Sequence, residues 1–481
     1  MALSLYNTLS RTVEPFVPLV EGTAGFYGCG PTVYNYAHIG NLRAYVTHDI
    51  LVRTLRRAGM KVTHVMNVTD VGHLTGDVDT GDDKMVKSAE ERGKSVLEVA
   101  AFYTDAFFKD TAALNIERPD VVCKATEHIA DMIALIVRIE ANGYTYSAGG
   151  NLYFDITKFP AYGELARLKL DDLKAGARIG VDENKRNPLD FALWFTKSKF
   201  ENQALTWDSP WGRGYPGWHI ECSAMSMRYL GESFDIHAGG IDHIPIHHTN
   251  EIAQSESATG KRWVKYWVHN EFLVMGKDKM SKSKGGFLTL QSLVDAGYHP
   301  LDYRYFLLGG HYRSQLQFSY DALDGARNAR KALTERIRLL AEKAGGAPPN
   351  ASLDRAALSE KGRAYLDAFD AALNEDLSTP RALAELWGLV RDGDLDAAEA
   401  LRLAFDMDRV FGLKLAEEAA AGAANADEDP AFVAEVEALI AKRTEAKKAR
   451  DFAAADAVRN ALKERGVILA DGPAGTTWRR A

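Results

Sequence analysis

The spacing of apolar side chains predicts alternating strands and helices in the first half of the chain. Residues 24–30 (AGFYGCG) form a short apolar run that is typical of a buried strand. Residues 39–58 carry apolar side chains at helical spacing, and residues 61–68 (KVTHVMNV) return to the pattern of a strand. Together the three segments predict a βαβ unit.

The alternation continues, with one interruption. Helices are predicted near 85–113, 127–142, 217–230 and 246–259, and strands at 119–124, 233–237 and near 267–275. The aromatic-rich stretch from Tyr144 to Phe159 is bounded by glycines and predicts a β-hairpin instead. We therefore expect a doubly wound α/β domain, residues 1–143 and 201–275, that is split by an insertion at 144–200.

The second half of the chain differs in residue composition and in the spacing of its apolar side chains. Residues 317–414 show an Ala/Leu/Arg-rich helical pattern, which predicts a helical domain. Residues 415–430 are acidic, rich in Ala and Gly and poor in large apolar side chains, so they predict a linker. A small final domain is expected at 431–481, and residues 276–316 connect the α/β domain to the helices.

Composition narrows the class of protein. A chain of 481 residues that is 46% hydrophobic can bury more than one core. Its three cysteines are too few, and odd in number, for a disulfide framework. The sequence lacks both the apolar core of a signal peptide and any apolar run of about 18 residues. We expect a cytoplasmic protein that does not interact with membranes.

Charge is distributed unevenly along the chain. The net charge is −8, but residues 442–481 contain ten Lys and Arg against five Asp and Glu, a local net charge of +5. On an acidic chain this reversal marks a candidate nucleic-acid surface. A solvated basic helix face is the alternative.

Two segments have the residues of a nucleotide site. His38-Ile39-Gly40-Asn41 opens the first long helix, where backbone N–H groups favour phosphate and His38 can donate a hydrogen bond to it. A histidine can also stand at a helix start by chance. Lys279-Met280-Ser281-Lys282-Ser283 places two lysines on a loop with nearby glycines, which suits the stabilisation of a triphosphate. In this order, the pair resembles the two signatures of class I aminoacyl-tRNA synthetases, which have a Rossmann-like domain split by an insertion.

A third set consists of possible metal ligands. His247 and Glu251 are four residues apart in a predicted helix and project from one face, as two ligands of one ion can. Cys29 and Cys222 come from distant segments. Each cysteine taken singly can equally be a small buried apolar residue, and His248 can replace His247 as the ligand.

Several segments, in order over nearly the whole chain, resemble cysteinyl-tRNA synthetases. They are FYGCGPTVYNYAHIGNLR (26–43), NVTD (67–70), GWHIECSAM (217–225), FDIHAGGID (234–242), HHTNEIAQS (247–255), KMSKS (279–283) and DGPAGTTWRR (471–480). The resemblance implies a Rossmann-like catalytic domain split by an insertion, then a region at 276–316 with the KMSKS loop and the contact to the tRNA stem. A helical tRNA-binding domain at 317–414 and a small anticodon-binding domain at 431–481 would follow. The resemblance also implies the reaction, in which ATP activates L-cysteine as its adenylate and tRNA(Cys) accepts the cysteinyl group.

The resemblance assigns roles to individual residues. It implies one Zn²⁺ per subunit, held by Cys29, Cys222, His247 and Glu251, which selects the cysteine thiolate over a serine hydroxyl. Mg²⁺ would accompany ATP, and the protein is expected to be a monomer. The implied catalytic residues are His38, Lys279 and Lys282, and the implied ATP-binding residues are Gly40, Asn41, Gly239, Asp242, Lys279, Met280, Ser281 and Ser283. Thr69 and Trp218 would shape the cysteine pocket, and Lys447, Phe452, Asp456 and Arg459 would contact the anticodon. Phe452 has an alternative place in the core of an amphipathic helix, and Trp478 is expected to pack.

The chain departs from the family pattern in places. Residues 72–81 (GHLTGDVDTG) are inserted before Asp82, Thr249 stands where a carboxylate is usual, and Ala238 replaces a glycine. These departures concern the details of the acceptor and not adenylation. Two rival functions are a cysteinyl-adenylate ligase with a small-molecule acceptor and a non-catalytic tRNA-binding paralogue. The intact signatures argue against the paralogue, and the basic C-terminal region argues against a small acceptor.

Overall fold

The computed structural model describes residues 3–71, 88, 94–168, 183–197, 205–275, 278–279, 287–346, 353–424, 430–449, 451–472 and 475–480. The chain forms two compact units. The first contains Met1–Ala332, Ser359–Leu389 and Met407–Leu413, and the second contains Leu333–Leu358, Val390–Asp406 and Lys414–Ala481. The predicted start of a helical domain at residue 317 is therefore not a boundary between the units, because parts of the later helices pack with the α/β core.

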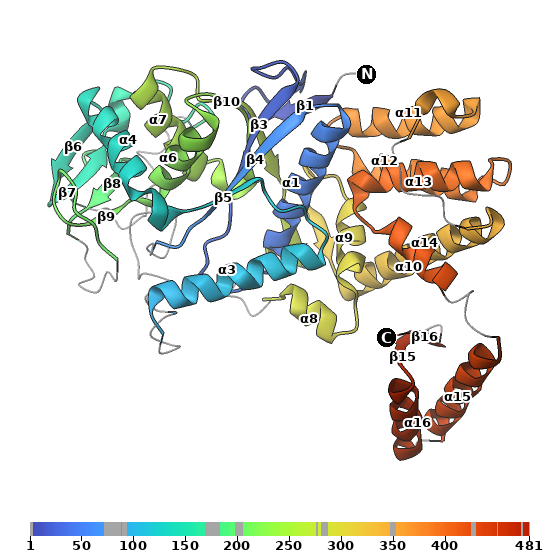
Figure 1. Cartoon of the computed structure of the whole chain (residues 1–481). Coiled ribbons are helices and arrows are strands. Elements are labelled where there is room, and N and C mark those ends of the chain that lie inside the picture. The colour runs from blue at the N-terminus through green and yellow to red at the C-terminus, as the bar shows by residue number, and fades with distance from the viewer. Residues whose placement is uncertain are drawn as a thin grey trace. The chain divides into compact units, whose positions relative to one another are not determined.

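A parallel five-stranded sheet organises the first unit (Figure 1). Its strand order is β11-β10-β3-β4-β5. The strands are β3 (Thr23–Gly28), β4 (Lys61–Val68), β5 (Val121–Lys124), β10 (Phe234–Gly240) and β11 (Val264–Asn270). All four strand pairs are parallel, so the carboxyl ends of the strands lie at one edge. In sheets of this kind that edge is where ligands bind.

Helices alternate with these strands as the sequence pattern predicts. They are α1 (Ile39–Arg57), α3 (Val96–Ala113), α4 (Ile129–Ala141), α6 (Trp218–Leu230) and α7 (His247–Thr259). Short 3₁₀ helices occupy Ala125–His128, Ile156–Lys158, Ile241–His243 and Arg355–Ala357. The predicted βαβ unit is confirmed, since α1 connects the parallel strands β3 and β4. Among the described residues, no helix is long and apolar enough to cross a membrane.

Two histidines are buried between α1 and the sheet. His48 of α1 and His64 of β4 both pack on the ring of Phe26, with centroids 5.5 Å and 4.6 Å away. Gly28 makes room for them, because a Cβ at this position would lie 2.9 Å from Nδ1 of His48. Burial, followed by the neighbouring His64, lowers the pKa of His48 to about 3, and burial lowers the pKa of His64 to about 4. Both rings are therefore neutral at pH 7.

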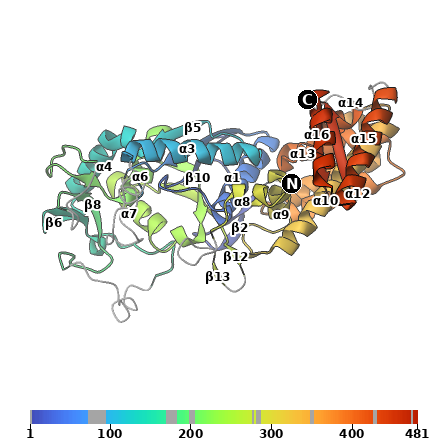
Figure 2. The same ribbon diagram turned by 90° about the horizontal axis from the view of Figure 1, so that it is seen from below.

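The predicted insertion forms a sheet of its own. Its strands, in the order β6-β7-β8-β9, are β6 (Thr145–Ala148), β7 (Asn151–Phe154), β8 (Phe191–Phe195) and β9 (Tyr215–Pro216). The predicted hairpin is confirmed by the antiparallel pair of β6 and β7. Because β9 pairs with β8, the insertion extends past its predicted end at residue 200, and the α/β domain resumes at α6. In Figures 1 and 2, β6 and β8 lie on the far side of β10 from α9 (Pro300–Leu308).

A smaller sheet follows β11. It consists of β12 (Leu273–Met275), β13 (Asp278–Lys279) and β14 (Leu316–Phe318), and α8 (Leu290–Asp295) lies before α9 in the chain. The strand predicted near 267–275 is thus two strands, β11 and β12, which belong to different sheets. At the other end of the unit's sequence, β1 (Ser4–Asn7) and β2 (Thr12–Pro15) pair with each other.

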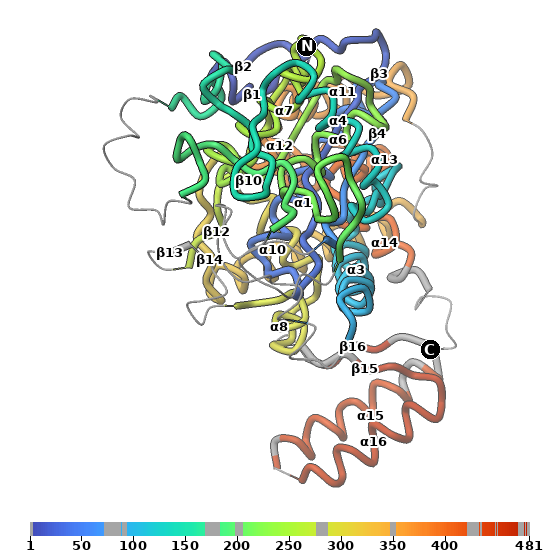
Figure 3. The backbone as a smooth tube through the Cα atoms, turned by 90° about the vertical axis from the view of Figure 1, so that its left-hand side faces the viewer, coloured from blue at the N-terminus to red at the C-terminus, as the bar shows by residue number. Residues whose placement is uncertain are grey.

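The remaining elements are mostly helical. They are α10 (Tyr320–Lys343), α11 (Glu360–Asn374), α12 (Thr379–Arg391), α13 (Ala397–Phe411), α14 (Leu415–Ala424), α15 (Pro430–Lys448), α16 (Phe452–Glu464), β15 (Val467–Gly472) and β16 (Gly475–Arg480). Residues 415–424, predicted as part of a linker, form α14, which buries Leu415 and Ala419. Figure 3 shows α15 and α16 as a helical pair, and β15 and β16 pair antiparallel.

Candidate active site and metal centre

Four side chains from three segments meet at the carboxyl edge of the main sheet. Cys29 directly follows β3, Cys222 lies on α6, and His247 and Glu251 lie one turn apart on α7. Two sulfurs, one imidazole nitrogen and one carboxylate oxygen lie within 4.8 Å of one another, and all four residues are buried. These are the four residues proposed from the sequence. We call them the donor cluster.

The electrostatics of the donor cluster favour a cation. Oε1 of Glu251 makes no hydrogen bond to any described residue, although it lies 3.0 Å from Nε2 of His247. Burial raises the pKa of the Cys29 thiol, and a hydrogen bond with Cys29, then burial, raises that of Cys222 well above its usual value. Both thiolates therefore need a strong positive charge at their centre. A Cys₂HisGlu donor set fits Zn²⁺, and its role as a ligand set stays a prediction.

A second donor set shares two members of the cluster. Cys29 and Glu251 also lie within 4.8 Å of ligand atoms of His237 and His248. Sγ of Cys29 is 3.3 Å from Nε2 of His248, and Oε2 of Glu251 is 3.0 Å from Nε2 of His237. This set has one sulfur instead of two, so it is the weaker match for zinc. The sequence left His248 open as a ligand, and the structure places it beside Cys29.

Two further histidines, which the sequence analysis did not single out, lie within hydrogen-bond distance of histidines of the two donor sets. Nδ1 of His247 lies 2.9 Å from Nδ1 of His219, and Nδ1 of His248 lies 2.7 Å from Nε2 of His269. Hydrogen bonds of this type fix the orientation of a ligand ring and leave its other nitrogen for the metal. The clustering of histidines in GWHIEC, FDIHAGG and HHTNE was the available signal, but it does not say which rings would touch.

His38 caps α1 through one nitrogen of its ring. Its Nδ1 accepts a hydrogen bond from the backbone N–H of Asn41 at 3.0 Å, and Oδ1 of Asn41 accepts one from the backbone N–H of His38 at 3.3 Å. Because Nδ1 is an acceptor, the neutral ring carries its proton on Nε2. A Cβ at Gly40 would come within 3.0 Å of the His38 ring. The motif thus forms a capping box in which the His38 side chain and the Asn41 side chain each accept from the other's backbone N–H.

The other predicted nucleotide residues are spread over several segments. Gly239 is the last but one residue of β10, and a Cβ there would lie 2.6 Å from Nδ1 of His243, so a side chain would displace this ring. Asp242 is exposed just beyond the strand. Lys279 lies in β13, opposite Val274 of β12. Met280, Ser281, Lys282 and Ser283 lie outside the described residues, as does the inserted loop at 72–81.

Comparison with known proteins places the whole chain in one family. It matches the model of the tRNA synthetases class I (C) catalytic domain over residues 15–328 and that of the cysteinyl-tRNA ligase anticodon binding domain over residues 429–479. It is 59% identical to the cysteine–tRNA ligase of Treponema denticola and 43% identical to that of Borreliella burgdorferi, over 100% of each chain. The chain belongs to the cysteine–tRNA ligase family.

Solved structures support the fold of this family member. The crystal structure of Mycobacterium tuberculosis methionyl-tRNA synthetase bound by methionyl-adenylate matches it with a TM-score of 0.55 at 17% identity, covering 83% of this chain and 91% of the other. At this identity the match concerns the fold alone. It confirms the predicted class I architecture, with its parallel sheet.

The two residues predicted to shape the pocket of this cysteine–tRNA ligase family member lie beside the donor cluster. Thr69 is buried, and its hydroxyl donates to Oε2 of Glu221 at 2.8 Å and accepts from Nδ2 of Asn67 at 3.1 Å. The ring of Trp218, at the start of α6, lies 4.6 Å from the ring of His247. Trp218 therefore packs directly on a proposed ligand. The contact of both residues with a substrate stays a prediction.

The segment matching the family's anticodon-binding domain presents its predicted residues to solvent. Phe452, Asp456 and Arg459 recur at i, i+4 and i+7 on α16 and are all exposed, and Lys447 is exposed near the end of α15. Phe452 is 64% exposed, so its alternative place in a helix core is wrong. The core of this region is formed by Val436, Leu462 and Val467, and Trp478 packs against it as expected.

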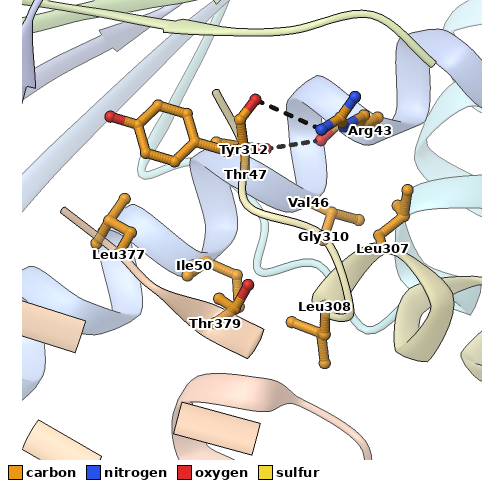
Figure 4. Close-up of a pocket in the computed structure, with 10 residues that line it drawn as sticks. All are labelled: Arg43, Val46, Thr47, Ile50, Leu307, Leu308, Gly310, Tyr312, Leu377 and Thr379. Carbon is orange, nitrogen blue, oxygen red and sulfur yellow. Dashed lines mark hydrogen bonds between the residues drawn. The ribbon is translucent and has the colours of Figure 1, made fainter. Parts of the chain in front are cut away.

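A small pocket lies elsewhere in the catalytic part of this family member. It has a volume of about 20 Å³ and is lined by residues of α1, α9 and the start of α12 (Figure 4). Such a volume accepts about one water molecule. It is therefore too small for a nucleotide, and neither the donor cluster nor His38 lines it.

Proposed function

We propose that this protein activates L-cysteine with ATP as cysteinyl-adenylate and transfers the cysteinyl group to the 3′ end of tRNA(Cys). The observation that carries the proposal is the donor cluster, in which two thiols, an imidazole and a carboxylate converge in a member of the cysteine–tRNA ligase family. Soft sulfur donors are what a site needs if it is to select a substrate by its own sulfur atom.

The proposed metal is one Zn²⁺ held by Cys29, Cys222, His247 and Glu251. When bound, zinc would stabilise a thiolate over a hydroxyl, and so distinguish cysteine from serine more strongly than pocket shape can. The chain's own contribution is to hold the four donors in place. His219 orients the ring of His247 through Nδ1, and Trp218 covers that ring from the side.

In the activation step, an oxygen of the cysteine carboxylate attacks the α-phosphorus of ATP, and pyrophosphate leaves with Mg²⁺. Nε2–H of His38 donates to a phosphate oxygen as negative charge builds, while the positive charges of Lys279 and Lys282 offset it. Gly40, Asn41, Gly239 and Asp242, with Met280, Ser281 and Ser283, complete the proposed ATP site. Positioning and electrostatics supply the rate enhancement, and no protein nucleophile is needed.

In the transfer step, a ribose hydroxyl at the 3′ end of tRNA attacks the carbonyl carbon of the adenylate, and AMP leaves. Lys447, Phe452, Asp456 and Arg459 are proposed to contact the anticodon. An exposed aromatic ring can stack on an unpaired base, and Asp and Arg can read base edges. The match to the anticodon-binding domain over residues 429–479 favours tRNA over a small-molecule acceptor. A cytoplasmic, monomeric enzyme belongs to the same proposal.

Two assays on the purified protein test this function. Cysteine-dependent exchange between ATP and pyrophosphate measures activation, and charging of tRNA(Cys) measures transfer. Both activities are expected, with serine supporting no exchange. Absence of exchange would refute the enzyme, whereas exchange without charging would favour the small-molecule acceptor. Metal analysis should find one zinc per chain.

A further inference from the structure

The side chain of Arg43, in the second turn of α1, has no role in the function proposed above. It is 3% exposed, and its guanidinium donates to four backbone carbonyl groups. Nη1 donates to the carbonyl of Phe272 at 2.6 Å, and Nη2 to those of Ser314 at 2.6 Å, His311 at 3.1 Å and Tyr312 at 3.5 Å. Figure 4 shows Arg43 reaching the segment that contains Tyr312.

These carbonyl groups lie where two neighbouring strands begin. Phe272 directly precedes β12, and Ser314 stands two residues before β14. The two strands are parallel partners, with Leu273 opposite Leu316, and the N–H of Leu316 donates to the same Phe272 carbonyl at 3.1 Å. One guanidinium therefore joins the starts of both strands to α1.

The same small sheet carries a signature lysine. On its other edge β12 pairs with β13, so that Val274 lies opposite Lys279. The first turn of α1 also holds the chain beyond the signature, because the N–H of Ile39 donates to the carbonyl of Leu288 at 2.8 Å, and His38 forms a β-bridge with Thr289. The helix that begins at His38 thus holds the chain on both sides of Lys279.

We propose that Arg43 is a positioning residue that fixes the strands around Lys279 relative to His38, the two residues proposed above to act on the phosphates of one ATP. The catalytic part of this inference rests on the proposed function. Misplacing a charge-stabilising group by about 1 Å can cost about 100-fold in rate. A side chain that holds the two parts of the proposed nucleotide site in place therefore affects the rate of activation directly.

The choice of arginine agrees with this role. Its planar guanidinium has five N–H donors in a fixed arrangement, whereas lysine has a single nitrogen that cannot span carbonyls from two strands. Arg43 forms no ion pair with the described residues, and burial lowers its pKa to about 10, so it stays charged at pH 7. Since apolar packing could join a helix to a sheet without burying a charge, stability alone does not explain this residue.

Kinetics of Arg43→Lys test the proposal, with Arg53→Lys as the matched control. Arg53 lies on the same helix and also donates to carbonyls, those of Asn115 and Arg409, each at 2.8 Å, but not to the small sheet. Arg43→Lys is expected to lower kcat/KM for ATP in pyrophosphate exchange by about 10- to 100-fold, with the KM for cysteine and the zinc content unchanged. Transfer from preformed adenylate to tRNA should keep its rate. Arg53→Lys should change none of these.

Amide hydrogen exchange supplies a readout that needs no activity. In Arg43→Lys, peptides covering residues 271–275 and 314–318 are expected to exchange at least about tenfold faster, while Arg53→Lys leaves them unchanged. No local change, or equal kinetic losses in both variants, would overturn the proposal. If the parent protein shows no cysteine-dependent exchange, the proposed function fails, and the hydrogen-exchange result still decides whether Arg43 holds the strands.

Discussion

The donor cluster and the C-terminal region differ in how far their proposed functional side chains are buried. Cys29, Cys222, His247 and Glu251 are each at most 7% exposed, and their positions depend on three segments packing together. Phe452 is 64% exposed and belongs to a single short helix. Chemistry in the first region is inseparable from folding, whereas in the second a side chain can be removed without disturbing a core. The following substitutions test this difference.

The largest effect is expected for Cys222→Ser. It removes a soft donor from the cluster, so zinc binding should fall by more than the roughly 10- to 100-fold cost of losing an outer-sphere partner, and cysteine activation should become undetectable. Metal analysis and pyrophosphate exchange measure the two losses. Cys123→Ser is the control, because Cys123 is equally buried but its Sγ donates to the carbonyl of Met66 outside the cluster. If Cys222→Ser retained zinc, the ligand assignment would be wrong.

His38 lies between the two extremes, since it is half-buried, caps a helix and belongs to the proposed nucleotide site. His38→Asn keeps a good N-cap but removes Nε2–H, so activation should fall about 100- to 1,000-fold with little change in thermal stability. His38→Ala should show the same kinetic loss and in addition lose about 1 kcal/mol of stability. Equal activity in His38→Asn and the parent protein would remove His38 from the catalytic step.

Phe452→Ala tests the exposed region. Loss of one base–aromatic stack costs about 1–3 kcal/mol, so KM for tRNA should rise about 10- to 100-fold. Pyrophosphate exchange and the unfolding midpoint should not change, because the ring contributes to no core. Ile468→Ala, also exposed in this region, serves as the control and should leave the KM for tRNA as it is. A drop in stability instead of affinity would contradict the comparison.

The smallest effect is expected for His48, which is buried and has no proposed chemical role, and it concerns the pH dependence of stability. The pKa of His48 is about 3 in the folded protein, against about 6.5 when unfolded, so only the unfolded chain takes up a proton as pH falls below 6.5. This residue should cost about 1.4 kcal/mol of stability between pH 8 and pH 5.5. Urea unfolding at both values should show His48→Gln to be less acid-sensitive than the parent by that amount. An identical acid dependence in the two proteins would show that His48 is not neutral and buried.

Much of the catalytic core could be predicted from local pattern. In the strand at 61–68 and the helix from residue 39, the spacing of apolar side chains agrees with the element that forms. The end of the insertion could not be predicted, because β9 is two residues long and exists only through its pairing with β8. The acidic, Ala-rich composition of residues 415–424 predicts a linker, but α14 forms there and buries Leu415.

The candidate site was predictable only in part. Helical spacing brings His247 and Glu251 together, whereas the cysteines could be added only by family resemblance. The role proposed for Arg43 had no signal in the sequence. Its partners are backbone carbonyl groups, which every residue has, so no pattern of side chains marks them.

The donor cluster also has a consequence for how the protein is made. Cys29 and His248, which touch, are separated by 219 positions in the chain. At a synthesis rate of about 5–20 residues per second, Cys29 leaves the ribosome roughly 10–45 s before its partners on α7. During that interval the thiol of Cys29 must stay reduced, and its final neighbours on α7 do not yet exist. Binding of the proposed zinc ion would therefore have to follow synthesis of the second half of the sheet, and a nascent chain that stalls inside the insertion cannot complete the cluster.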